Sequence, residues 1–164
     1  MDARGLVKIC GLSTEETLDA ALDAGADMIG LVFFEKSPRN VSLQTAAGLA
    51  ERARGRAETV VLTVDADDAL VDAIVSGVRP DWLQLHGHES PARCAELKAR
   101  HGLRIMKALG VSSAGDLAAA APYVPHVDRL LFDAKPPKGA VLPGGNGVSF
   151  DWRILKGLDL GVPL

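Results

Sequence analysis

The stretch Val7–Gly11, VKICG, decides the fold. It reads as a short strand that ends in a cysteine and a glycine. Because strand side chains alternate between two faces, Lys8 and Cys10 point the same way. A strand of an open sheet with helices on both faces tolerates an inward lysine badly, whereas a barrel strand can present polar groups at the barrel mouth. The stretch therefore favours a (β/α) barrel over an open doubly wound sheet.

Five further apolar runs follow this strand, and helical patterns with start and stop signals separate most of them. The six predicted strands are residues 6–10, 28–34, 59–64, 82–86, 104–109 and 129–133. Alternation of strands and helices indicates a parallel sheet covered by helices. The segment after the first strand, ICGLSTEE, has no G-x-G-x-x-G dinucleotide loop. We predict one α/β domain over residues 1–164, of the (β/α)8 TIM-barrel type.

Five helices are predicted between these strands. The first opens at Ser13, with Glu16 completing a capping box, and stops at Gly25. The others are a helix at about 42–55, one from the Asp-rich turn DADD to about residue 77, one that starts with Ser90 as N-cap and Pro91 as N1, and a short alanine-rich helix at 113–121.

The C-terminal part breaks this rhythm. Residues 134–149, AKPPKGAVLPGGNGVS, favour no helix, and a loop of this length is functional or flexible. Residues 150–160 predict one or two helical turns, and GVPL at 161–164 resembles the start of a seventh strand. Six strands and the start of a seventh do not close an eight-stranded barrel, so we expect a C-terminally incomplete barrel domain.

Composition narrows the function classes. Hydrophobic residues make up 48% of the 164 residues, which is typical of a globular chain, and no apolar run has the length of a membrane span. A net charge of −3 argues against a nucleic-acid partner. The N-terminus runs into a strand without a signal-peptide pattern. The two cysteines, Cys10 and Cys94, fall in a strand end and a helix, so we expect no disulfide and a cytoplasmic protein.

Barrel enzymes carry their active sites at the carboxyl ends of the strands. The polar residues there are Cys10, Arg39, Asp65, His86, Lys107 and Asp133. Cys10 is either a small buried hydrophobe or, beside the ammonium of Lys8, a thiolate that acts as a base. Cys94, inside a helix, is predicted to be structural.

Asp133 has two interpretations. It forms an ion pair with Lys8 or Lys135, or its apolar setting raises its pKa so that it donates a proton. With Cys10 it would form a base and acid pair, which suits isomerisation better than hydrolysis. Arg39, in a turn after the second strand, could grip a substrate carboxylate with two hydrogen bonds, although surface arginines are usually solvated.

Three further features have open interpretations. His86 could orient its neighbours by hydrogen bonds, and its spacing from His88 raises the question of a metal, but no third ligand has obvious spacing, so we predict no metal site. Lys107 could face either the site or the packed interior. The GGNG stretch at 144–147 could form a backbone nest for an anion or the hinge of a lid.

Five motifs in register resemble the phosphoribosylanthranilate isomerase family: VKICG (7–11), GADMIGLVFFEKSPRNVS (25–42), LQLHGHE (83–89), LLFDAK (130–135) and LPGGNGVSFDW (142–152). The resemblance implies a (β/α)8 barrel that catalyses an Amadori rearrangement in tryptophan biosynthesis without metal or organic cofactor. It implies that Cys10 is the general base, Asp133 the general acid and Arg39 the carboxylate ligand. We add Lys8, as the cation that keeps Cys10 ionised, and His86 to the substrate-binding residues.

The resemblance also implies the partners: a small phosphorylated substrate, no nucleic acid and no membrane, with the chain a monomer or a homodimer. In the family, loops after strands seven and eight hold the phosphate, and this sequence ends at Leu164, before either loop. Two alternatives therefore stay open. One is a catalytically impaired barrel fragment or interaction module, and the other is an isomerase of a related phosphoribosyl amine.

Overall fold

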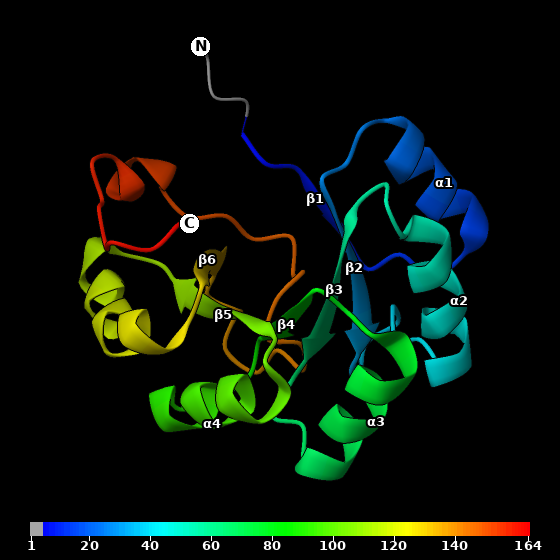
Figure 1. The fold of residues 1–164 in the computed structure, drawn as a ribbon. Coiled ribbons are helices and arrows are strands. Elements are labelled where there is room, and N and C mark those ends of the chain that lie inside the picture. The colour runs from blue at the N-terminus through cyan, green and yellow to red at the C-terminus, as the bar shows by residue number, and fades with distance from the viewer. Residues whose placement is uncertain (1–4) are drawn as a thin grey trace. The chain divides into compact units, whose positions relative to one another are not determined.

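A computed structural model describes residues 5–164 of the chain. The chain divides into two compact units, the first ending at Leu83 and the second beginning at Gln84 (Figure 1). The boundary falls within strand β4 (Trp82–Leu85), so this strand contributes residues to both units. The prediction of a single domain stays a prediction.

The first unit alternates strands and helices without interruption. Its elements are β1 (Lys8–Cys10), α1 (Glu15–Asp23), β2 (Met28–Phe33), α2 (Leu43–Ala53), β3 (Glu58–Thr63), α3 (Asp68–Val78) and the first half of β4. Strands β1, β2 and β3 pair in parallel, with Cys10 opposite Gly30 and Phe33 opposite Thr63. All six residues of β2 are buried, as expected for a parallel strand that is covered on both faces.

The second unit continues the alternation with shorter helical elements. Its elements are the second half of β4, α4 (Pro91–His101), β5 (Arg104–Val111), the 3₁₀ helix η1 (Ala114–His126), β6 (Arg129–Ala134) and the 3₁₀ turn η2 (Trp152–Leu155). Strands β5 and β6 are parallel, and Gly110 lies opposite Asp133. No helix or strand interrupts residues 135–151, so the long loop is confirmed.

The order of strands in the sheet is β1-β2-β3-β4-β5-β6, the same as their order in the chain. A doubly wound open sheet reverses its strand order at a switch point, whereas a (β/α) barrel adds each strand beside the previous one. The predicted α/β class with six parallel strands of the TIM-barrel type is therefore confirmed. Each predicted strand is present, and its ends lie within two residues of the prediction.

Three local predictions need correction. The N-cap of α1 is Thr14, not Ser13, because the Thr14 hydroxyl accepts the hydrogen bond from the Thr17 amide. The fifth helix is a 3₁₀ helix that runs on to His126, since in an α-helix the rings of its two prolines would clash with the carbonyls four residues earlier. The GVPL segment is not a strand, although the Leu130 amide in β6 donates to the Pro163 carbonyl at 3.0 Å.

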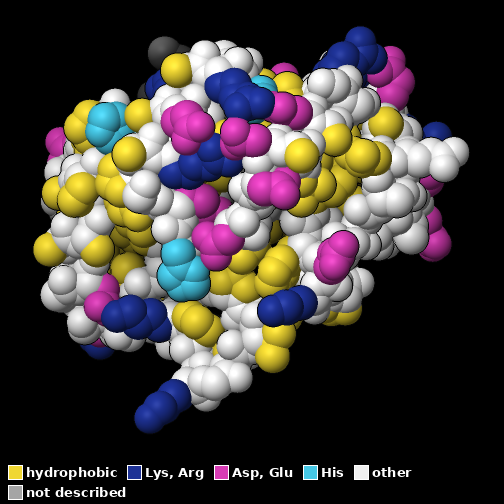
Figure 2. All heavy atoms as spheres, turned by 90° about the horizontal axis from the view of Figure 1, so that it is seen from below, with side chains coloured by type: hydrophobic (Ala, Val, Ile, Leu, Met, Phe, Trp, Pro, Cys, Tyr) yellow, Lys and Arg dark blue, Asp and Glu magenta, His cyan; other side chains and the backbone are white. Residues whose placement is uncertain are grey.

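Charged side chains are distributed without a single-sign patch on the face shown in Figure 2, where basic and acidic groups lie interspersed with apolar ones. Among residues 5–164, no helix has both the length and the apolar character that crossing a membrane requires.

Candidate functional site

In the first unit, the predicted residues Lys8, Cys10 and Arg39 gather around two glycines. A Cβ atom placed on Gly30 would lie 2.8 Å from the Cys10 Sγ and 3.1 Å from the Lys8 Nζ, so the thiol and the ammonium converge above this glycine. Cys10 is exposed. We call these three side chains, with Gly11 and Gly30, the Cys10 cluster. Its thiol is exposed at the end of β1, on the same face of the strand as the Lys8 ammonium.

Gly11 brings Arg39 into this cluster. Its φ of +84° lies in the left-handed region, which suits glycine, and a Cβ atom there would overlap the aliphatic part of the Arg39 side chain, with Nε only 3.2 Å away. The guanidinium stem therefore lies across the turn that follows Cys10. Arg39 itself is exposed, so its donors are available to an anion.

The turn that carries Arg39 is held by its own polar groups. The Asn40 side-chain carbonyl accepts the Phe34 amide at 2.8 Å, and the Ser37 hydroxyl accepts the Arg39 amide at 3.2 Å. Beyond the turn, the Val41 amide donates to the Val32 carbonyl at 3.0 Å. These bonds fix the backbone of the turn, and the Arg39 side chain is exposed on it.

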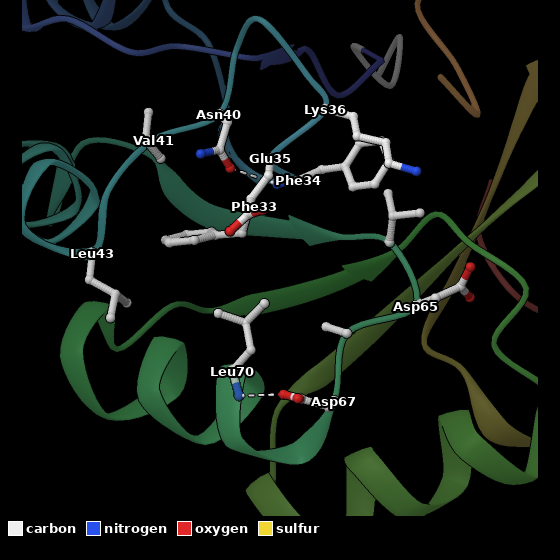
Figure 3. A pocket seen from close by; sticks show the side chains of 12 residues that line it. Phe33, Phe34, Glu35, Lys36, Asn40, Val41, Leu43, Asp65, Asp67 and Leu70 are labelled. Atoms are coloured by element: carbon white, nitrogen blue, oxygen red, sulfur yellow. Dashed lines mark hydrogen bonds between the residues drawn. The ribbon is translucent and has the colours of Figure 1, made fainter. Parts of the chain in front are cut away.

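A hollow of about 510 Å³ lies beside this turn (Figure 3). It is lined from the ends of β2 and β3 and from the segments that follow them, with apolar side chains such as Phe33 and Leu70 and the carboxylates of Asp65 and Asp67. The structure therefore places Asp65 on the wall of this hollow. Neither Cys10 nor Arg39 lines it.

In the second unit, the predicted residues His86 and Asp133 meet. His86 directly follows β4 and Asp133 lies near the end of β6. The His86 Nε2 is 3.5 Å from the Asp133 Oδ2, which is the long limit of a hydrogen bond, and the side chains are 14% and 32% exposed. The Ala134 amide also donates to the Asp133 Oδ1 at 2.8 Å. The Asp133 carboxylate is thus half-buried, and both the His86 side chain and the Ala134 amide contact it.

The predicted rise in the pKa of Asp133 is wrong. The hydrogen-bonding contact with His86 lowers the pKa of the Asp133 carboxyl, burial acts in the opposite direction, and the Ala134 amide lowers it further. The predicted ion pair with Lys135 is also wrong, because the Lys135 ammonium pairs with Asp116 instead. His86 is the neighbour that holds Asp133 ionised.

The glycine-rich loop lies against this pair. A Cβ atom on Gly144 would overlap the Asp133 Oδ2 and would lie 2.7 Å from the His86 Cε1. Only a residue without a side chain lets the loop backbone approach so closely. The Asn146 side-chain amide donates to the Leu142 carbonyl at 3.0 Å and closes the loop tip on itself. The anion-nest and hinge interpretations of residues 144–147 stay predictions.

Lys107 faces the interior, which settles the alternative left open by the sequence. Its side chain is 1% exposed, and its ammonium donates to the Glu89 Oε2 at 2.9 Å and to the Gly87 carbonyl at 2.7 Å. Sequence reasoning missed Glu89. The available signal was the lysine inside an apolar strand, because a buried ammonium needs a carboxylate and LQLHGHE supplies one.

Cys94 is buried in α4, as predicted, and burial raises the pKa of its thiol to about 11. Both cysteines are free. Within the described part of the chain, no group of three or more His, Cys, Asp or Glu side chains is arranged to hold a metal ion.

The fold, the Cys10 cluster and the His86–Asp133 pair define a (β/α)-barrel protein with a thiol and a carboxyl at strand ends. The model of the N-(5'-phosphoribosyl)anthranilate (PRA) isomerase family matches residues 7–161. The chain belongs to this family. It is 63% identical over 158 residues to the N-(5'-phosphoribosyl)anthranilate isomerase of Afipia carboxidovorans, covering 96% of this chain and 68% of the relative. It is 63% identical to the Rhodopseudomonas palustris isomerase, covering 96% and 72%.

Solved structures agree with this family. The phosphoribosyl anthranilate isomerase of Thermotoga maritima superposes with a TM-score of 0.81 at 30% identity, covering 93% of this chain and 70% of that one. A second isomerase structure, a complex with reduced 1-(o-carboxyphenylamino)-1-deoxyribulose 5-phosphate, superposes with a TM-score of 0.74 at 29% identity, covering 80% and 66%.

Proposed function

We propose that this chain catalyses the Amadori rearrangement of N-(5-phosphoribosyl)anthranilate to 1-(2-carboxyphenylamino)-1-deoxyribulose 5-phosphate in tryptophan biosynthesis. The observation that carries the proposal is the family match over residues 7–161. The reduced product in the related complex supports the same chemistry. The reaction moves hydrogen within one molecule, so it needs an acid and a base and no net oxidant.

Cys10 is the base of the proposed reaction. After the ring opens to a Schiff base between C1 and the anthranilate nitrogen, the thiolate removes the C2 proton, and the C2 electron pair moves toward the nitrogen to give an enolamine. Tautomerisation of the enolamine gives the C2 ketone. The exposure of the thiol at the end of β1 supports this role, because the base must reach the C2 proton of the substrate.

Asp133 is the acid that protonates the furanose ring oxygen as the bond from C1 to that oxygen breaks. His86 lowers the pKa of Asp133, so the carboxyl is ionised at neutral pH. Burial opposes this lowering of the pKa but does not outweigh it. A substrate that covers it and excludes water therefore shifts it toward the protonated form that donates.

Arg39 binds the anthranilate carboxylate with its exposed guanidinium, which can donate two parallel hydrogen bonds. Lys8 and His86 complete the substrate-binding residues. The proposal also includes a single barrel domain that is a monomer or a homodimer. We propose a cytoplasmic location, which the two free cysteines support. The Thermotoga maritima relative is described as a dimeric isomerase from which monomers were generated.

Turnover of phosphoribosylanthranilate, followed by the change in anthranilate fluorescence, tests the proposal. We expect Cys10→Ala and Asp133→Asn each to lower kcat by about 10²- to 10⁴-fold, the usual contribution of a general base or acid. Arg39→Met is expected to raise KM more than it lowers kcat, because it removes a binding contact. Cys94→Ala is the matched control, since this thiol is buried in α4.

Near wild-type turnover in folded Cys10→Ala or Asp133→Asn would refute the role of that residue. An inactive but folded wild-type chain would refute the proposed function of this chain. Turnover of another phosphoribosyl amine in place of phosphoribosylanthranilate would favour the related isomerase instead.

A further inference from the structure

Lys107 and Glu89 are the two charged residues that are buried among residues 5–164. Their side chains are 1% and 4% exposed, and the Nζ to Oε2 distance is 2.9 Å. The ring of Tyr123 lies 5.8 Å from the same ammonium, and the Tyr123 hydroxyl donates to the Glu89 carbonyl at 3.0 Å. The ion pair is thus buried and in contact with Tyr123.

The partners of this ion pair flank one residue, His86. The Lys107 ammonium donates to the Leu85 carbonyl at 3.3 Å on one side of His86 and to the Gly87 carbonyl at 2.7 Å on the other. The Glu89 Oε2 also accepts the Gly87 amide at 2.9 Å, which belongs to the peptide bond that leaves His86. Lys107 and Glu89 therefore hold the backbone immediately before and after His86.

Stability alone is a weak reason for this arrangement. Two charges lose their hydration when they are buried, and apolar residues of similar volume are often as stable as a buried ion pair. A pair of apolar side chains could fill the same space, but it could not hold the carbonyl and amide groups around His86. The two charged side chains therefore contribute hydrogen bonds that hold the backbone on either side of His86.

We propose that Lys107 and Glu89 are positioning residues that fix His86 in contact with Asp133. The His86 Nε2 is 3.5 Å from the Asp133 Oδ2, so a small displacement of the loop would break the contact. A misplacement of about 1 Å can reduce turnover by 10²-fold. The effect on turnover rests on the proposed function of Asp133, whereas the effect on the His86 contact does not.

The test compares three variants of the full chain. Lys107→Met/Glu89→Leu removes both charges together and leaves no unpaired charge in the interior. Glu89→Gln keeps the shape of the side chain and removes its charge. Lys98→Met is the matched control, because the Lys98 ammonium also pairs with a carboxylate of the second unit, Asp128, at 2.7 Å. Carbon-13 NMR reads the titration of the Asp133 carboxyl, assigned with Asp133→Asn, and steady-state kinetics gives kcat and KM.

In the double variant, we expect the pKa of Asp133 to move up from its lowered value toward the ordinary one, since His86 no longer stabilises the carboxylate. We expect kcat to fall by about 10- to 100-fold, because His86 is displaced from its contact with Asp133, and any rise in KM to reflect the displaced His86 alone. In a His86→Asn background, the same double substitution should change kcat by less than about twofold. Lys98→Met should match wild type in both measurements.

A folded double variant in which Asp133 titrates as in wild type overturns the proposal, whatever its turnover. So does a double variant that lowers kcat equally with and without His86. If the double variant does not fold, Glu89→Gln decides in the same way. An inactive wild-type chain would refute the proposed function, and the NMR titration would still decide whether Lys107 and Glu89 position His86.

Discussion

Gly30 controls the geometry of the Cys10 cluster from the neighbouring strand. It lies opposite Cys10 in the register of β1 and β2, and a Cβ atom there would come within 2.8 Å of the Cys10 Sγ and 3.0 Å of the Cys10 Cα. Glycine weakens a strand, and its presence often marks the close approach of another group. Here that group is the thiol, with the Lys8 ammonium beside it.

Gly30→Ala should therefore disturb the thiol. We expect turnover to fall by about tenfold or more, because the added methyl group must displace Cys10 or Lys8 from the positions they now share. Gly48→Ala is the control in the same unit, since a Cβ atom at Gly48 meets no atom within 4 Å. That change should keep full turnover and stabilise α2 by about 0.5–1 kcal/mol. Equal turnover in both variants would contradict the role assigned to Gly30.

Single residues were predictable where a local rule fixed the direction of the side chain. Alternation along VKICG placed Lys8 and Cys10 on one face, and the structure brings their polar atoms together above Gly30. The contact of His86 with Asp133 was not predictable, although both were candidates, because nothing local sets which strand ends face each other. Glu89 differs, because the sequence held a signal for it: Lys107 lies inside an apolar strand, and a buried ammonium needs a carboxylate.

At the scale of an element, Asp116 organises the start of η1. Its Oδ2 accepts the amides of Ser112 at 2.8 Å and Ser113 at 3.0 Å, and the Lys135 ammonium contacts its Oδ1. The hydrogen bond from Lys135 is the largest of several interactions that lower the pKa of this carboxyl. One carboxylate thus joins the end of β5, the beginning of η1 and the first residue after β6.

Asp116→Asn should lower the Tm by a few degrees at neutral pH, and this loss should shrink in acid. Because the folded-state pKa of Asp116 lies below the ordinary value of 3.8, the carboxylate stabilises the fold above that value, and its contribution is lost as the pH falls. Thermal unfolding at about pH 7, 5 and 3 measures the difference. Glu16→Gln is the control, since Glu16 is an exposed carboxylate of α1. A Tm difference for Asp116→Asn that does not depend on pH would contradict this assignment.

Elements were predictable to the extent that their end signals were unambiguous. Ser90 is an N-cap as expected, and Ser42 caps the helix predicted at about 42–55; each accepts the amide three residues on. The first helix offered Ser13 and Thr14 side by side, and both residue types cap helices, so the sequence could not separate them. For η1, the alanine run predicted an α-helix, but the following prolines favour the 3₁₀ form.

At the scale of the whole chain, strand and helix alternation was enough to predict a parallel sheet, and the polar face of β1 was enough to favour the barrel order of strands. The boundary between the two compact units was not predictable. It falls within β4, whose four residues are all buried and contain no turn signal, so nothing in the sequence marks it.

This shared strand predicts that the two units unfold together. Trp82 at its start donates from Nε1 to the Glu58 Oε2 in the first unit, and the Leu85 carbonyl at its end accepts from Lys107 in the second. Four residues are too few for half of the strand to persist alone, so losing either unit removes support from the other.

Leu83→Ala tests this cooperativity, because Leu83 is fully buried in the middle of β4. The cavity should destabilise the chain by about 2–5 kcal/mol. Amide hydrogen exchange along a urea series, read on peptides from β2 and β3 and on peptides from β5 and β6, should give one common midpoint in wild type. The substitution should lower that midpoint equally in both sets, because a single cooperative transition has a single free energy. A midpoint that moves only for β2 and β3 would show that the units unfold independently and that β4 does not couple them.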